Sequence, residues 1–190
     1  MCIRDREEAD ETSWEIGHFL QLALQGHPLV LETLVAPVVT MDDWGAELRQ
    51  LFPRLWSAQA AYESFLNYCD NQRKKMLEKK DGRPAKYAAA YVRVLFNLCE
   101  LLERGTFSIR ISETPVGEAV ARIKAGHFRP GEVIDMGEYW TQEATRRMRA
   151  CSQQASPELA DAFLLQARKP FLHSPGLRPR FRPTFINKPA

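Results

Sequence analysis

The sequence predicts a mainly α-helical fold with one or two short β-strands. Apolar residues recur at helical spacing from Ser57 and, most regularly, through residues 84–104, as expected of helices that each bury one face. Residues 106–111 alternate and are rich in β-branched side chains, which favours a short strand or an extended arm. Residues 12–14 are also β-like, so we expect a strand end there.

The first helix is expected within residues 9–25, where that strand end runs into an amphipathic segment. Thr12 and Glu15 fit the S/T-x-x-E pattern of a capping box. Gly26 suits the position that follows the last residue of a helix. This start predicts that Thr12 is the N-cap and that Glu15 is its partner at the third helical position.

Turn and capping residues divide the rest of the chain into further helices. Asp42 or Asp43 is expected to cap a short helix that reaches Leu51. Pro84 suits the first position of a long helix that Gly105 ends. Residues 115–125, residues 131–150 and a segment that starts at Ser156 are predicted to be helical.

Composition and charge exclude several classes of protein. The 190 residues are 45% hydrophobic and 26% charged, which is ordinary for a globular chain. Twenty-six basic and 24 acidic residues give a net charge of +2, too balanced to indicate nucleic-acid binding by itself. No run approaches the roughly 20 apolar residues of a membrane span, so we expect no membrane partner.

The cysteines and histidines predict neither disulfides nor a zinc site. The four cysteines lack CxxC spacing and are interpreted as reduced thiols of a cytoplasmic protein, with Cys69 and Cys99 in the core. The four histidines are scattered without the spacing that zinc ligands need. The sequence also contains no P-loop, GxGxxG, HExxH or GxSxG motif.

Lys86 and Arg93 are the most informative local arrangement. They stand seven residues apart, about two helical turns, and therefore share one face of an otherwise apolar helix. Two cations that project to one place suit a polyphosphate, whose oxygens need charge-assisted donors. The alternative is that each cation extends to solvent or pairs with Glu100, Glu103 or another acid.

Several strings in order resemble one family. They are the strings at residues 12–24 and 27–34, Tyr68 with Gln72, Lys86 with Arg93, Glu100-Leu101-Leu102 before Gly105, Ile123-Lys124-Ala125-Gly126 and Gly131-Glu132-Val133-Ile134. Together they are similar to nucleotidyltransferases of the DNA polymerase beta superfamily, of the type associated with RNA repair. The resemblance runs from about residue 10 to about residue 167.

The resemblance implies a catalytic α/β core followed by a helical region. It implies transfer of a nucleoside monophosphate from an NTP to an unknown acceptor, with Mg²⁺ or Mn²⁺ held by three carboxylates. Lys86, Arg93, Tyr68 and Gln72 would then bind the nucleotide. RNA or another nucleic acid is an expected partner beside the NTP.

The sequence departs from the family pattern at the metal site. No Gly-Ser followed by Asp-x-Asp occurs in the chain. Asp10 is our candidate for the third carboxylate, catalytic and metal-binding, with Glu11 as the alternative. Glu32 could support the site or cap a helix, and Ala90 stands where many relatives have His.

The first residues suggest why the motif is missing. Residues 1–6 resemble translated adapter DNA, so we expect native sequence to begin near Glu7 and an upstream segment to be missing. We divide the rest into a remnant of the catalytic core (7–56), a helical region (57–167) and a basic, proline-rich tail (168–190). The chain alone is then expected to be inactive.

Two other functions also suit the sequence. The basic residues 73–80 and the tail would suit a module that binds nucleic acid. The amphipathic helices alone would equally suit a non-catalytic domain that binds a protein partner.

Overall fold

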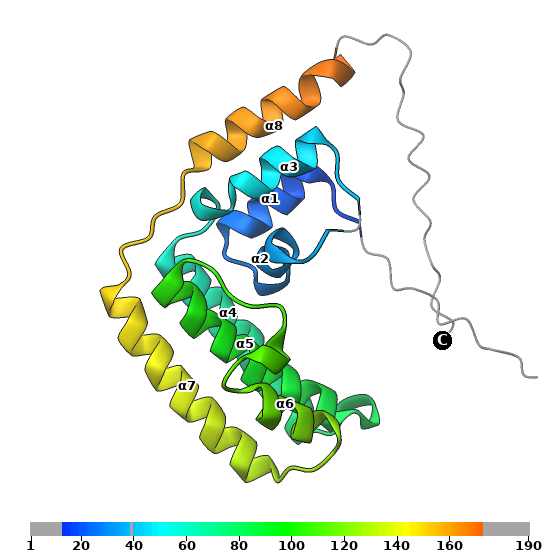
Figure 1. Ribbon diagram of the computed structural model, residues 1–190, viewed down its shortest axis with the longest axis vertical. Helices are drawn as coiled ribbons and strands as arrows, with labels where there is room; N and C mark the ends of the chain where they lie inside the picture. The colour runs from blue at the N-terminus through cyan, green and yellow to red at the C-terminus, as the bar shows by residue number, and fades with distance from the viewer. Residues whose placement is uncertain (1–12, 39, 173–190) are drawn as a thin grey trace, which may run out of the picture.

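The computed structural model describes residues 13–38 and 40–172, and this part of the chain is helical (Figure 1). Three short 3-10 turns, at Phe52–Arg54, Lys80–Gly82 and Ile111–Glu113, lie between successive α-helices. The α-helices are α1 (Ile16–Leu24), α2 (Pro28–Val35), α3 (Asp43–Gln50), α4 (Ala58–Leu77), α5 (Pro84–Arg104), α6 (Gly117–Lys124), α7 (Pro130–Ala150) and α8 (Pro157–Leu172). The prediction of a mainly α-helical fold is confirmed.

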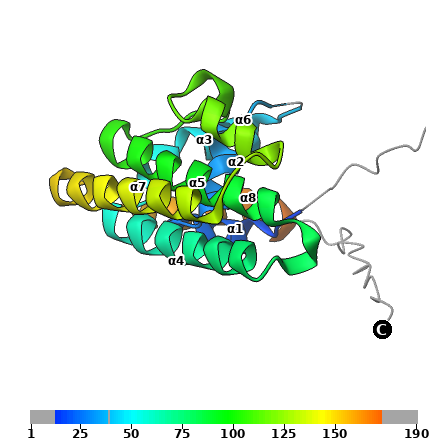
Figure 2. The ribbon, with the colours of Figure 1, turned by 90° about the horizontal axis from the view of Figure 1, so that it is seen from below.

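Helix α5 lies at the centre of the molecule. It packs against α4, α6 and α7, and Figure 2 shows α7 lying against the α4–α5 pair. Its side chains are buried on almost every side, and Val92, Leu95 and Leu98 have no exposed surface. A helix that is apolar nearly all round needs such neighbours. The charged side chain of Arg93 on this helix therefore needs a specific explanation.

The predicted strands do not occur in the described residues. Gly105 adopts φ 73° and ends α5, and residues 106–110 then run without regular structure. No second extended segment of the described chain pairs with them, and an unpaired segment forms no β-ladder. Phe107 is instead buried edge-to-face on Phe65, with ring centroids 6.4 Å apart. The short-strand expectation is wrong for these residues.

Helix α1 begins differently from the capping box that the sequence predicts. Its N-cap is Glu15, whose carboxylate accepts the backbone N–H of His18 at 2.9 Å. A carboxylate is favourable there because the helix dipole is positive at its N-terminus. Thr12, the predicted cap, lies outside the described residues. The predicted cap of α3 is confirmed, since Asp42 accepts the N–H of Gly45 at 2.7 Å.

Helix α8 returns to the N-terminal helices. The Arg168 guanidinium lies 2.6 Å from the Glu15 carboxylate, and the rings of Phe163 and Trp44 meet edge-to-face at 5.9 Å. Residues 168–172, assigned from the sequence to the basic, proline-rich tail, continue the helix. Residues 173–190 lie outside the described part.

Cys69 and Cys99 are buried, as predicted. Burial raises the pKa of the Cys69 thiol above its ordinary range and that of Cys99 to about 12, so both stay protonated at neutral pH.

Among the described helices, none combines the length and apolar character that crossing a membrane requires.

Candidate functional site

A cavity of about 600 Å³ opens beside α5. Its wall comes from α4, from the segment that follows Gly105 and from the last turn of α6. The lining residues are Tyr68, Lys86, Ala89, Ala90, Arg93, Ile109, Ile111 and Lys124. Three of the side chains are cationic, and none of the acidic residues in the described part of the chain lines the cavity.

Helix α5 supplies one continuous face of this cavity. Lys86, Ala89, Ala90 and Arg93 follow one another at spacings of three, one and three residues, which places them along one side of the helix. The two alanines leave room between the two cations, which stand about 10 Å apart along the axis. The prediction that Lys86 and Arg93 point to one place agrees with this geometry.

Arg93 pairs with a carboxylate that the sequence does not place beside it. Its guanidinium lies 2.5 Å from Glu32 on α2, with 21% and 24% of the two side chains exposed. Glu100 and Glu103 bind elsewhere, to Arg104 and Arg147. The alternative that Arg93 pairs with another acid is therefore confirmed, with Glu32 as that acid. Glu32 therefore holds Arg93 at the cavity wall and caps no described helix.

The structure separates the other predicted nucleotide ligands. Tyr68 lines the cavity, and burial raises the pKa of its hydroxyl, which remains a neutral donor at neutral pH. Gln72 stands one turn further along α4, is only 6% exposed and does not line the cavity. Asp10 and its alternative Glu11 lie outside the described residues.

Lys124 is a cavity residue that no local sequence pattern singles out. It ends α6, which Val120 and Ile123 anchor in the core. The start of α6 approaches the preceding turn so closely that a Cβ at Gly117 would collide with the Ile111 carbonyl oxygen. The only sequence signal for Lys124 is its place in the Ile123-Lys124-Ala125-Gly126 string. Tertiary packing brings it to the cavity that Lys86 also lines.

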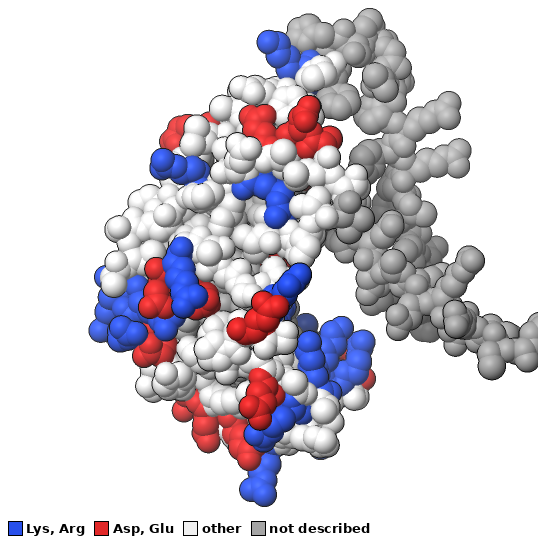
Figure 3. All heavy atoms as spheres, viewed as in Figure 1, with Lys and Arg blue, Asp and Glu red and all other residues white. Residues whose placement is uncertain are grey.

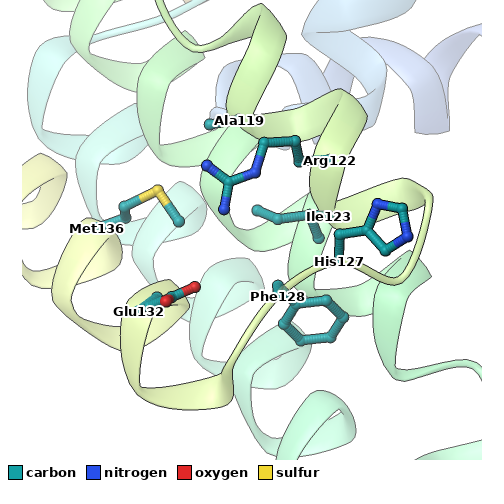
Figure 4. A pocket seen from close by; sticks show the side chains of 7 residues that line it. All are labelled: Ala119, Arg122, Ile123, His127, Phe128, Glu132 and Met136. Atoms are coloured by element: carbon teal, nitrogen blue, oxygen red, sulfur yellow. The ribbon is translucent and has the colours of Figure 1, made fainter.

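A second cavity, of about 240 Å³, lies between α6 and α7 (Figure 4). Ile123, Phe128 and Met136 give it an apolar lining, and Arg122 and Glu132 face it from opposite sides. The Glu132 carboxylate also accepts the Arg129 backbone N–H at 3.3 Å. Opposite charges make this cavity a poor site for a polyphosphate.

The described residues offer no metal site. No group of three His, Cys, Asp or Glu side chains comes together within residues 13–38 and 40–172. The three metal-binding carboxylates that the resemblance implies are therefore not found together in the described residues. The cavity beside α5 is lined by cations instead.

Comparison with known proteins identifies the family. The model of the RNA repair pathway DNA polymerase beta family matches residues 3–122, more than half of the chain. The chain belongs to this family. The matched range begins inside residues 1–6 and ends just before Lys124. It includes Asp10, Glu32, Tyr68, Lys86 and Arg93. No curated protein and no solved structure matches the chain.

Membership confirms the resemblance found in the sequence and gives the cavity a context. Membership of a DNA polymerase beta family suggests that the chain is of the nucleotidyltransferase type. The matched range contains most of the cavity wall, and Lys124 extends that wall beyond it.

Proposed function

We propose that the chain functions in nucleotidyl transfer and that the cavity beside α5 binds the triphosphate of an NTP. The observation that carries this proposal is the convergence of Lys86, Arg93 and Lys124 on one cavity with Tyr68 at its wall. Three cations suit a triphosphate, and Arg93, whose NH1 binds Glu32, keeps further N–H donors for a phosphate oxygen. A volume of about 600 Å³ is in the range of small-molecule sites.

The reaction would be an in-line displacement. An acceptor hydroxyl attacks the α-phosphorus, the new P–O bond forms, the bond to the bridging oxygen breaks, and pyrophosphate leaves while the hydroxyl loses its proton. Negative charge grows on the leaving group during this step. Cations held at the β- and γ-phosphates would stabilise that charge, which is the main way a protein promotes phosphoryl-type transfer.

We assign the cavity residues a role in nucleotide binding only. Mg²⁺ or Mn²⁺ would be a cofactor of the transfer, but the described residues do not fit a metal site. The 190 residues also lack Gly-Ser followed by Asp-x-Asp. We therefore expect the chain by itself to bind NTP without transferring a nucleotide.

Nucleotide binding is tested by titrating a fluorescent ATP analogue into the 190-residue chain and into the Arg93→Gln and Lys124→Gln variants. Each substitution removes one charge-assisted contact, and such a hydrogen bond contributes about 1.5–3 kcal/mol. We therefore expect a rise in Kd of about tenfold or more for each variant.

Arg122→Gln is the matched control. Arg122 stands two residues before Lys124 on the same helix but lines the other cavity. The control should bind the analogue like the unchanged chain. Equal Kd values for all four proteins, or the same weakening by Arg122→Gln, would contradict the proposed site.

A further inference from the structure

The cavity between α6 and α7 differs in charge and size from the candidate nucleotide site. Among its lining side chains, Arg122 is a cation and Glu132 is an anion. Figure 3 shows basic and acidic side chains together at this end of the molecule. The volume of about 240 Å³ lies below the roughly 300–1,000 Å³ of sites for drug-sized ligands. The cavity therefore suits a small ligand that carries charges of both signs.

Helix α6 supplies one wall of this cavity. Ala119, Arg122 and Ile123 line it, at spacings of three and one residues, and so share one face of the helix. Ile123 is only 2% exposed and anchors this face in the core. The small side chain of Ala119, three residues before Arg122, leaves space beside the guanidinium.

The turn after α6 and the start of α7 supply the opposite wall. Gly126 has a φ of 82°, in the left-handed region that favours glycine, and lets the chain reverse there. The half-buried ring of Phe128 follows in the turn. Glu132 stands in the first turn of α7, where its hydrogen bond with the Arg129 N–H holds the carboxylate, and Met136 lies one helical turn further on.

The two charges face the cavity without neutralising each other. Within the described residues, neither Arg122 nor Glu132 takes part in an ion pair. Figure 4 shows them on opposite sides of the cavity, with apolar side chains between them. Both residues are exposed, so a ligand can reach them from solvent. A ligand that bridges them needs an anionic group and a cationic group close together.

We propose that this cavity binds a free α-amino acid with an apolar side chain. The α-carboxylate accepts hydrogen bonds from the Arg122 guanidinium, and the α-ammonium donates to the Glu132 carboxylate. The apolar side chain of the ligand packs on Ile123, Phe128 and Met136. This proposal is independent of the proposed nucleotide site, which is a separate cavity.

Ligands with a single charge match the cavity less well. A carboxylate alone meets the like charge of Glu132, and an amine alone meets that of Arg122. Within a peptide chain both α-groups are amides, so neither charge is present. A free amino acid places both charges on one carbon atom and satisfies both residues.

The test follows the methionine methyl groups of the 190-residue chain by NMR while L-leucine is added. The chain has five methionines. The methyl signal of Met136, assigned with a Met136→Leu variant, should shift until the site is saturated. Met76, which is 2% exposed and lies outside this cavity, should not shift and serves as the internal control.

Two leucine derivatives separate the two charges. N-acetyl-L-leucine lacks the ammonium group, and L-leucinamide lacks the carboxylate. Each derivative loses one charge-assisted contact, so its Kd should be about tenfold above that of L-leucine.

Two variants assign those contacts to residues. Glu132→Gln, which keeps a side chain that a capping box accepts, should weaken L-leucine about tenfold and abolish the difference between L-leucine and the N-acetyl derivative. Arg122→Gln should do the same for the difference between L-leucine and the amide. Asp135→Asn and Arg149→Gln are the matched controls, because both residues are exposed and neither lines the cavity. Both controls should bind L-leucine like the unchanged chain.

Three results would overturn the proposal. The first is a Met136 signal that does not shift with L-leucine up to about 10 mM. The second is an equal Kd for L-leucine and its two derivatives, which would mean that the cavity takes an apolar group without reading its charges. The third is equal weakening by the control variants, which would place the binding elsewhere.

Discussion

Two carboxylates of the N-terminal helices hold arginines from distant elements. Glu32 on α2 binds Arg93 on α5, and Glu15 at the start of α1 binds Arg168 on α8. The sequence does not reveal either pairing, because the two residues of each pair are 61 and 153 positions apart in the chain. Glu32 lies beside the candidate site, whereas Glu15 joins the two ends of the described chain.

The Glu15–Arg168 pair predicts a small dependence of stability on pH. The hydrogen bond from Arg168 lowers the pKa of Glu15 from 4.5 to about 2. A lowered pKa in the folded state stabilises the protein above the unfolded pKa, and this contribution is lost as pH falls from about 4.5 to about 2. Both side chains are about half exposed, so solvent limits the contribution to about 1 kcal/mol or less.

Urea unfolding of the unchanged chain and of Glu15→Gln checks this prediction. The free energies of unfolding should differ at pH 7 and converge near pH 2. A difference that stays constant, or grows as the pH falls, would show that the ion pair is not its source.

At the scale of elements, the contact between α5 and α7 depends on a glycine. A Cβ at Gly137 of α7 would collide with the ring and hydroxyl of Tyr91 on α5. Tyr91 is buried, so its ring has little space to move. We expect Gly137→Ala to lower the free energy of unfolding by about 1–3 kcal/mol, the usual effect of overpacking.

Gly131→Ala is the matched control on the same helix. Nothing lies within 4 Å of a Cβ at this position, and alanine favours a helix by roughly 0.5–1 kcal/mol over glycine. Chemical denaturation should show Gly131→Ala to be neutral or stabilising. A stable Gly137→Ala variant would mean that α7 and α5 pack less closely than the structure shows.

At the scale of the whole molecule, local signals explain what the sequence predicts and tertiary contacts explain what it misses. Gly105 and Pro84 define α5, and apolar spacing defines its buried faces. The spacing of Lys86 and Arg93 also predicts their shared face. The strand at 106–111 fails because pairing needs a neighbour that local pattern does not reveal.

Lys124 is missing from the sequence prediction for the same reason. Lys124 comes 38 residues after Lys86, and only the packing of α6 on α5 brings it to the cavity. Gln72 shows the opposite effect, because its helical register turns it into the core, away from the cavity wall. Asp10 remains a prediction, since it lies outside the described residues.

Lysine footprinting tests the central claim, that the cavity beside α5 binds a nucleoside triphosphate. The 190-residue chain would be acetylated with and without ATP, and modification of each lysine measured by mass spectrometry. ATP should protect Lys86 and Lys124, which line the cavity, and leave Lys79 and Lys80 as reactive as before. Unchanged modification of Lys86 and Lys124 at saturating ATP, or equal protection of all four lysines, would contradict the site.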